Sequence, residues 1–532
     1  MFLLEICLNS YRARSLKKSR VKLTEGDCWQ HWVDGGLEKG LDSEIGAGAP
    51  TELDGVYNSI FISSAQKNLV IRNDPLGQRP LYYREAGGNL YIGSCFWDVM
   101  GAVSGESSSP LNEEALEYLL TLRRIVPSHH TLHREIFILP AGGQLVKTGG
   151  SPLRLSHVVG MQQMADEAIT VHDAALELKR NMLKGLTRIK ESGDYSCFWF
   201  GNSGGLDSRV IPALAEEAGL GCKGFLVSGD QIPGLRNLSK LGSQKVAEKY
   251  GIENKLIDYK SKKCTNIQRL SADALVNPFG PANYHKNPEY CDFSGSLVVN
   301  GGNSFLIAND NSSWKQYLGK GERALNGYFS DILVRKGHPN SGLPPFVEET
   351  LRQEMRGLVD LSDDFSVCRT LHQKYLNKSS PMGAFESMNW AGEFHYLYYS
   401  GKSTLYRHWP KELFFDRRVQ KEFMRHFYPD LMNIADQGGN RPDDKGKRNK
   451  MRSFIARVRG NGLNYGFWVR SGWFRQLVND VSNLGFVKTN SRSRNILQKS
   501  GEFSSAQDNL DMVKLAVVVG MIEAGQLPND LS

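Results

Sequence analysis

Short apolar runs separated by turn-forming residues characterise the chain from about residue 53 to residue 148. The runs at 68–71 and 89–92, for example, lie next to segments rich in glycine, proline, asparagine and aspartate. Apolar runs of this length between turn formers are typical of β-strands. We therefore predict a β-rich domain over residues 1–155. The stretch at 147–152 is a candidate linker, because glycine and proline are concentrated there.

Beyond residue 165, short apolar runs alternate with stretches of helical periodicity. Strands and helices that alternate in this way build a parallel sheet with helices packed against it, which is a Rossmann-like α/β arrangement. Gly219 stands where the first of these helices should end. The predicted strands are residues 197–200, 224–227, 255–259 and 297–299, and the predicted helices are residues 208–218 and 238–250.

The remainder of the chain, from about residue 320, has few strand-like runs and is predicted to be mostly helical. Residues 419–427 are a clear amphipathic stretch. Because no obvious linker separates these helices from the α/β part, we expect them to pack on it. The second predicted domain therefore covers residues 165–532.

The segment Ser203-Gly-Gly-Leu-Asp-Ser208 lies where the first strand of the parallel sheet ends and its first helix begins. Parallel sheets bind ligands at this edge. Ser203 can donate a hydroxyl hydrogen bond, Gly204 and Gly205 let phosphate oxygens approach the backbone, and the helix N-terminus adds its positive dipole end. Asp207 would repel an anion unless a divalent cation lay between them. The segment thus predicts a pyrophosphate site with Mg²⁺, whereas the structural alternative is a turn with Asp207 and Ser208 as caps.

Charge and cysteine usage narrow the class of protein. The 65 Lys and Arg residues against 57 Asp and Glu give a net charge of only +8, and the most basic stretch, at 445–452, has no interleaved aromatic residues. We therefore expect no nucleic-acid partner. The 8 cysteines form no CxxC pair, which argues against a disulfide framework and a zinc site of that type. Glu5 interrupts the apolar start and Lys514 the longest apolar run, so we expect no membrane association and a cytoplasmic protein.

Taken together, these segments resemble a known family, the PP-loop ATP pyrophosphatases, and within it the asparagine synthetase and β-lactam synthetase group. The segment at 203–208 matches the family's pyrophosphate loop without a substitution. The stretch at 72–83 resembles the group's glutaminase domain, and the stretch at 242–251 resembles the helix after the second strand. The resemblance implies an N-terminal β-rich domain of the Ntn-hydrolase type, similar to a class II glutaminase, followed by a PP-loop α/β synthetase domain with a helical tail.

The resemblance also implies a chemistry, in which a relative joins a carboxylate to ATP, releases pyrophosphate and lets an amine attack the acyl-adenylate. By position in the family, backbone groups near Val227 and Gly301 would hold the adenine, and Asp207 would hold Mg²⁺. Lys445 would lie near the reacting acyl carbon, where a cation stabilises the oxyanion and the leaving phosphate. A solvated basic loop is the alternative for Lys445.

Two departures from the family pattern bear on function. A glutamine-using relative needs a cysteine directly after the initiator Met, because the processed terminus supplies both thiolate and amine base. This sequence has Phe2 there, with Cys7 and Cys28 as the nearby thiols, so we expect a degenerate glutaminase. Relatives also carry an aspartate for Mg²⁺ in a second nucleotide loop, where this sequence has Asn303. An amide oxygen carries no net charge, so metal affinity should fall unless Asp310 substitutes.

Loss of the glutaminase points to relatives that close an amide with an amine already on the substrate, such as β-lactam, carbapenam and lasso-peptide macrolactam synthetases. The segments at 300–304, 399–402 and 444–457 resemble the lasso-peptide type. That resemblance implies macrolactam formation on a leader-cleaved peptide, with a leader-peptide protease and a leader-binding protein as partners. Glu393, Tyr398 and Tyr399 lie in a region suited to the base that deprotonates the amine, although core packing suits the tyrosines better.

Two other functions stay open on the sequence alone. One is ammonia-dependent amidation of a small acid, which ammonium should stimulate. The other is a catalytically silent nucleotide-binding scaffold, which Phe2 and Asn303 make credible and which would release no pyrophosphate. In both enzyme hypotheses the substrates are ATP and a peptide or small-molecule carboxylate.

Overall fold

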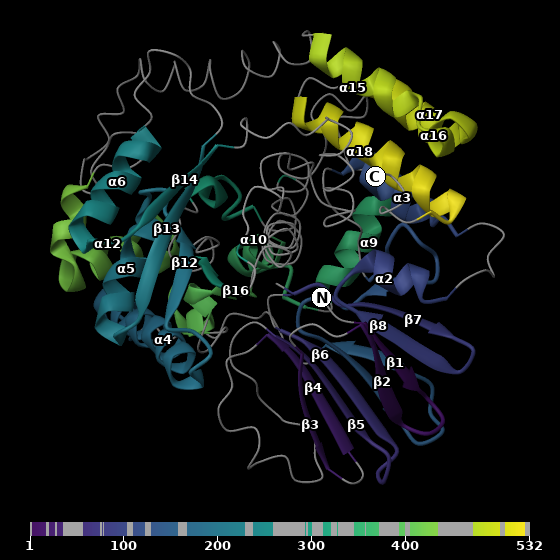
Figure 1. Cartoon of the computed structure of the whole chain (residues 1–532), viewed down its shortest axis with the longest axis horizontal. Coiled ribbons are helices and arrows are strands. Elements are labelled where there is room, and N and C mark those ends of the chain that lie inside the picture. Colours follow the sequence, from purple (N-terminus) through teal and green to yellow (C-terminus); the bar gives the residue numbers. More distant parts are fainter. Residues whose placement is uncertain are drawn as a thin grey trace.

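The chain forms two antiparallel sheets in its N-terminal part, one parallel sheet in the middle, and helices packed against them (Figure 1). It is therefore a mixed α/β protein, as the sequence predicts. The computed structural model describes residues 3–17, 21–26, 29–35, 57–74, 77, 79–103, 110–122, 129–157, 168–228, 238–258, 293, 296–300, 312–320, 327, 345–356, 358–371, 393–399, 405–434, 472–500 and 506–526.

Two antiparallel sheets make up the N-terminal part, with strand orders β2-β1-β8-β7-β9 and β11-β10-β6-β5-β4-β3. The apolar runs at 68–71 and 89–92 lie in β6 and β8, so the β-rich character of this region is confirmed. The strands are β1 (Leu3–Cys7), β2 (Arg12–Lys17), β3 (Val21–Gly26), β4 (Trp29–Gly35), β5 (Tyr57–Ser63), β6 (Asn68–Asn73), β7 (Tyr82–Ala86), β8 (Asn89–Gly93), β9 (Phe137–Ile138), β10 (Gly143–Thr148) and β11 (Arg154–His157).

An apolar core joins the two antiparallel sheets. Alternate residues of a strand point to opposite faces, so Leu4 and Ile6 of β1 lie in a core shared with β5, β6, β7, β8 and β10. The other face of the first sheet carries Leu3 and packs against α2 (Phe96–Gly101) and α3 (Glu113–Thr121). The first sheet is therefore covered on both faces.

The stretch at 147–152 is a hairpin turn, and its prediction as a linker is wrong. β10 and β11 pair antiparallel, with Leu145 opposite Leu155, and Gly149 in the turn between them has φ +55°. Glycine and proline serve tight turns and linkers equally well, so composition does not separate the two. The predicted domain boundary at residue 155 falls within β11.

The middle of the chain forms a parallel sheet of strand order β14-β13-β12-β15-β16. The four predicted strands and two predicted helices are confirmed, and Gly219 ends the first helix with φ +67°. Because the strand order runs outward in both directions from β12, this strand marks the topological switch point of the sheet. The elements are α4 (Val171–Ser192), β12 (Cys197–Gly201), α5 (Leu206–Ala218), β13 (Gly221–Ser228), α6 (Leu238–Tyr250), β14 (Asn254–Asp258), β15 (Leu297–Asn300) and β16 (Glu393–Tyr396).

The first helices of the tail complete the core of the parallel sheet, as expected. The amphipathic stretch at 419–427 forms α12, in which Val419, Phe423 and Met424 are buried in this core. The remaining elements of this region are α9 (Pro345–Arg356), α10 (Asp364–Leu371), α12 (Arg418–Phe427) and the 3₁₀ helices η4 (Ser312–Gln316), η7 (Leu397–Tyr399), η8 (Leu405–His408), η9 (Lys411–Phe414) and η10 (Pro429–Asn433).

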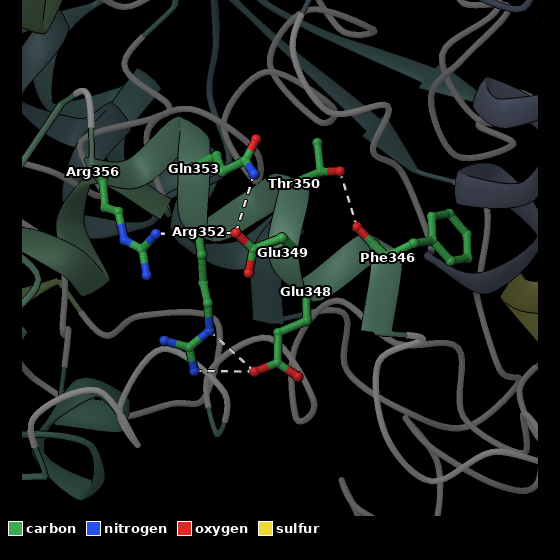
Figure 2. Close-up of polar contacts among 7 residues, drawn as sticks. All are labelled: Phe346, Glu348, Glu349, Thr350, Arg352, Gln353 and Arg356. Carbon is green, nitrogen blue, oxygen red and sulfur yellow. Dashed lines mark hydrogen bonds and ion pairs between the residues drawn. The ribbon is translucent and has the colours of Figure 1, made fainter.

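Helix α9 connects the N-terminal helices to the core of the parallel sheet. Figure 2 shows the polar contacts along it, among them the ion pair of Arg352 Nη2 with Glu348 Oε1 at 3.0 Å, one helical turn apart. Thr350 donates to the carbonyl oxygen of Phe346 at 2.9 Å and accepts a hydrogen bond from Tyr118 of α3, also at 2.9 Å. The Tyr118 ring also contacts Phe346.

The last four helices pack on the N-terminal part, so the expectation that the whole tail packs on the α/β core is wrong. Their buried side chains share one cluster with Trp97 of α2 and Leu116 of α3. Arg492 forms an ion pair with Glu113 of α3, and Figure 1 shows these helices beside α3. Local periodicity predicts that a helix is buried but not against which surface. The helices are α15 (Gly472–Ser482), α16 (Gly485–Thr489), α17 (Ser491–Lys499) and α18 (Ala506–Ala524).

Helix α18 contains the longest apolar run of the chain and is buried along most of its described length. Lys514, which interrupts that run, is only 1% exposed. Within the described ranges, α18 included, the structure has no helix with the combined length and apolarity that crossing a bilayer requires.

The described cysteines are free thiols. Cys95 and Cys368 are buried, whereas Cys7, Cys197 and Cys222 are half-buried. Burial raises the pKa of the Cys222 thiol and that of the Cys368 thiol to about 12, so both stay protonated. These two thiols therefore behave as packing groups.

His133 is expected to make the stability of the N-terminal part depend on pH. Burial, reinforced by the Arg84 guanidinium, lowers the pKa of His133 to about 4 from its ordinary 6.5, and Nδ1 accepts a hydrogen bond from the Glu135 amide at 3.2 Å. The unfolded chain therefore binds more protons below pH 6.5, so the stability present above that pH is lost as the pH falls towards 4. Between pH 7 and pH 4.5 the loss should be about 2 kcal/mol.

Urea unfolding at these two pH values checks this prediction. His133→Gln cannot gain the proton, so its free energy of unfolding should fall less than that of the wild type by about 2 kcal/mol. Burial also lowers the pKa of His395, to about 3, so both proteins should keep some pH dependence. Equal losses in the two proteins would contradict the assignment to His133.

Candidate functional site

The predicted pyrophosphate loop lies at the carboxyl end of β12, the central strand of the parallel sheet. Residues 203–205 form the loop, and residues 206–208 open helix α5 (Figure 1). Both neighbouring strands, β13 and β15, run parallel to β12, so the segments that follow all three strands leave the same edge of the sheet. This edge, at a topological switch point, is where parallel sheets bind ligands.

Gly204 brings the loop into direct contact with the backbone of helix α6. Its φ is +67°, and a Cβ added there would lie 2.5 Å from the carbonyl carbon of Gly242 and 2.6 Å from the amide nitrogen of Ser243. No side chain fits between these two stretches of backbone. Gly205 is less constrained, because an added Cβ would meet only the Ser203 hydroxyl oxygen, at 3.1 Å.

Two asparagines tie the loop to α6 and β14. Asn202 is fully buried, and its side-chain Nδ2 donates to the carbonyl oxygen of Ser243 at 2.9 Å. Its backbone N–H donates to the carbonyl oxygen of Phe225 at 2.7 Å. Asn254 of β14 donates to the Ser243 hydroxyl at 2.8 Å. The residue before the loop is therefore held in place from three neighbouring elements.

The two serine hydroxyls of the segment converge at the first turn of α5. Ser203 Oγ and Ser208 Oγ are 3.2 Å apart, and the Gly205 amide donates to Ser203 Oγ at 3.2 Å. Ser208 is buried and Ser203 half-buried. Hydroxyl groups beside a helix N-terminus form a cluster of hydrogen-bond donors in a positive field, which suits the oxygens of an anion.

Asp207 is half-buried and is held by residues far away in the sequence. Gln420 of α12 donates from Nε2 to the Asp207 carboxylate, and the Tyr398 hydroxyl donates to the Asp207 carbonyl oxygen at 3.4 Å. Burial, with the Asp207 charge nearby, raises the pKa of Tyr398 well above its usual value, so the phenol keeps its proton. Tyr398 lies in the apolar core and acts as a donor, which fits packing better than the role of a base.

Arg209, the residue after the segment, holds the loop through hydrogen bonds to its backbone. Its guanidinium is completely buried and donates to the carbonyl oxygens of Gly204 at 2.6 Å and Gly205 at 3.2 Å. It also donates to the carbonyl oxygens of Leu431 at 2.9 Å and Ile434 at 2.6 Å. One charged group therefore joins the loop to the segment after α12.

The segment as a whole offers two kinds of group to a ligand. The serine hydroxyls and the start of α5 present donors suited to phosphate oxygens, while the Gly204 and Gly205 amides donate within the loop, to Asn202 Oδ1 at 3.4 Å and Ser203 Oγ at 3.2 Å. The Asp207 carboxylate and the serine hydroxyls supply the hard oxygen atoms that Mg²⁺ prefers, so the donor set fits that cation.

The structure places one other predicted site residue at the same edge of the sheet. Val227 is the residue before the last in β13, two residues beyond Phe225, which pairs with the last residue of β12. Glu393 is the first residue of β16. Cys7 is the last residue of β1, and a hydrogen bond with the Ser10 side chain lowers the pKa of the Cys7 thiol. Phe2, Cys28, Gly301, Asn303, Asp310 and Lys445 lie outside the described residues.

Comparison with known proteins gives one family match. Residues 40–154 match the family model of a glutamine amidotransferase domain, so the N-terminal part resembles such a domain, as the sequence predicts. This match supports an enzyme of the amidotransferase or ligase type. A search of curated proteins finds no match.

Among solved structures, the chain is similar to an NMN synthetase from Francisella tularensis, at 16% identity over 41% of this chain and 92% of that chain, with a TM-score of 0.18. It is also similar to a glutamine phosphoribosylpyrophosphate amidotransferase from B. subtilis, complexed with ADP and GMP, at 11% identity over 54% of this chain and 58% of that chain, with a TM-score of 0.16. Likenesses this distant bear on neither the fold nor the chemistry of the chain.

Sequence reasoning missed the residues that support the loop. Asn202 and Arg209 flank the segment directly, and the available signal was a polar residue at each end of it, just inside the apolar runs that end at Phe200 and begin at Val210. Gln420 lies 213 residues from Asp207 in the sequence, so no local pattern could have linked the two.

Proposed function

We propose that the chain is an ATP-dependent ligase that adenylates a substrate carboxylate, releases pyrophosphate and then forms an amide. The observation that carries the proposal is the position of the Ser-Gly-Gly-Leu-Asp-Ser segment at the carboxyl end of β12. The segment lies at the edge where parallel sheets bind ligands, and Arg209, Asn202 and α6 hold the loop in that position. A glycine-rich turn with only a capping role would need none of this support.

In this proposal each residue of the segment has a defined task towards ATP. The Ser203 and Ser208 hydroxyls donate hydrogen bonds to the two phosphates that leave, and Gly204 and Gly205, which have no side chains, let the phosphate oxygens approach the start of α5. Bound Mg²⁺ would supply positive charge between these phosphates and Asp207. Gln420 orients the Asp207 carboxylate, and Val227 contributes backbone beside the adenine. By resemblance, Gly301 does the same, and Asn303 or Asp310 completes the metal site.

Adenylation is the step that makes amide formation possible. A free carboxylate is a poor electrophile because its charge is delocalised, whereas an acyl-adenylate carries a good leaving group. The amine that attacks it forms a tetrahedral oxyanion, which a nearby cation stabilises. Lys445 is the residue that we assign to this task, from its place in the family's lysine loop.

The finer proposal is an intramolecular amide, formed as a macrolactam on a peptide. The segments at 300–304, 399–402 and 444–457, which resemble lasso-peptide synthetases, support it. A leader-peptide protease and a leader-binding protein would then be the partners, and the peptide's own amine would be the nucleophile.

A second candidate is amidation of an acid with ammonia. The match of residues 40–154 to a glutamine amidotransferase domain favours it, because such domains release ammonia from glutamine. The two candidates share the adenylation step and differ only in the nucleophile.

Incubation with ATP, Mg²⁺ and candidate substrates tests the proposal, with AMP and pyrophosphate measured together. A leader-cleaved peptide should lose one water on ring closure, whereas ammonia-dependent amidation should replace a hydroxyl by an amino group and respond to ammonium. Asp207→Asn should lower pyrophosphate release by about 100-fold, the scale expected for lost charge stabilisation. Lys445→Ala should still bind ATP but form no product.

Asp194→Asn is the matched control, since this exposed aspartate lies before β12 and away from the loop. It should release pyrophosphate like the wild type. Unchanged release from Asp207→Asn would refute the site, and no release from the wild type with any acid would favour a nucleotide-binding scaffold.

A further inference from the structure

Two histidines and a glutamate meet where the first turn of α4 contacts α12. His172 belongs to α4, Glu422 and His426 belong to α12, and one potential ligand atom from each lies within 4.8 Å of the others. His172 Nδ1 is 3.6 Å from Glu422 Oε1, and the two imidazole rings meet edge to face with centroids 4.4 Å apart. Figure 1 shows α4 and α12 on the same side of the parallel sheet.

Local structure fixes both sides of this cluster. Glu422 and His426 are four residues apart, so they lie on one face of α12. His172 is the second residue of α4, and a capping box holds that end of the helix. In it, the Asp173 amide donates to the Thr170 hydroxyl at 3.2 Å and the Thr170 amide donates to the Asp173 carboxylate at 3.1 Å.

We propose that this cluster, His172, Glu422 and His426, is a Zn²⁺ site. Two ligand atoms on one zinc ion lie about 3.3 Å apart, given bond lengths near 2.0–2.1 Å. His172 Nδ1 and Glu422 Oε1, at 3.6 Å, are already close to that spacing, and rotation of the His426 side chain can bring in the third ligand. Two imidazoles and a carboxylate are a ligand set that zinc favours, with water in the fourth position. Arg425 lies 3.9 Å from the other Glu422 oxygen, which leaves Oε1 on the side of His172.

Zinc bound here would join two helices that also support the candidate site. α12 carries Gln420, which donates to the Asp207 carboxylate, and α4 packs against α5, whose first turn contains Asp207. An ion held only by the folded arrangement stabilises it, because the unfolded chain separates the ligands. The zinc site does not depend on the proposed ligase activity, since its ligands lie outside the loop.

Zinc titration of the full-length chain, without an affinity tag and after treatment with a chelator, tests the proposal. A chromophoric zinc indicator competes for the ion and gives the affinity. The wild type should bind one Zn²⁺, and His172→Ala, His426→Ala and Glu422→Gln should each bind at least about tenfold more weakly. His408→Ala, at a half-buried histidine of η8, is the matched control and should bind like the wild type.

Thermal unfolding gives a second measurement. Excess Zn²⁺ should raise the unfolding temperature of the wild type and of His408→Ala by about 2 °C or more, and should raise that of His426→Ala by clearly less. All variants keep every cysteine, so any zinc bound by thiols contributes equally to the signals of the wild type and of each variant. If the wild type takes up no zinc, or if the three ligand variants bind it as tightly as the control, the cluster is a histidine–glutamate ion pair and the proposal is wrong.

Discussion

Replacement of Gly204 by alanine should destabilise the folded chain by about 3 kcal/mol and remove pyrophosphate release from ATP. The residue has φ +67°, which disfavours any side chain, and its added Cβ would lie 2.5 Å from the Gly242 carbonyl carbon and 2.6 Å from the Ser243 amide nitrogen. Because both contacts are with backbone, no side-chain rotation relieves them. Either the loop or α6 must move, and a moved loop takes the Ser203 hydroxyl away from the start of α5.

Gly193→Ala separates the two causes of this loss. Gly193 ends α4 with φ +72°, but an added Cβ there meets no atom within 4 Å. This variant should lose only about 1 kcal/mol, the cost of the left-handed conformation, and should keep its activity. Urea unfolding of both variants measures the difference. Equal losses would show that the loop does not approach α6 as closely as the structure indicates.

The elements around the candidate site were predictable because their signals are local. Residues 197–200 form an apolar run because β12 is the central strand, with Phe198 and Phe200 buried on one face and Cys197 and Trp199 half-buried on the other. Gly219 was predictable as the end of α5 because a helix often ends at a left-handed residue, which glycine adopts most readily, and Gly219 has that conformation. The hydroxyls, glycines and carboxylate of the candidate site belong to six consecutive residues, 203–208, so the sequence alone predicts them.

What the sequence did not predict depends on contacts between distant segments. β16 is four residues long, includes Glu393 and His395, and lies at the edge of the sheet, where a strand needs less apolar surface. Gln420 reaches Asp207 only because α12 packs beside α4 and α5. The last four helices each bury apolar side chains, yet nothing in their periodicity distinguishes the N-terminal sheet from the parallel one.

Removal of the Arg209 guanidinium should have the other large effect, a loss of about 4 kcal/mol of folding free energy in Arg209→Met. The methionine fills similar volume but leaves buried carbonyl oxygens of Gly204, Gly205, Leu431 and Ile434 without this donor. The loop and the segment after α12 would then separate. Pyrophosphate release should fall as well, because the guanidinium sets the direction of the Gly204 and Gly205 peptide groups.

Two further variants give this prediction its control. Arg418→Met makes the same chemical change at an exposed position at the start of α12, where unfolding in urea should differ from the wild type by less than about 0.5 kcal/mol. Arg209→Lys keeps the charge but cannot bond carbonyls on both sides of a planar group, so its stability should lie between those of the wild type and Arg209→Met. If Arg209→Met unfolded like Arg418→Met, the loop would be rigid through its asparagines and α6 alone, and the buried arginine would be dispensable.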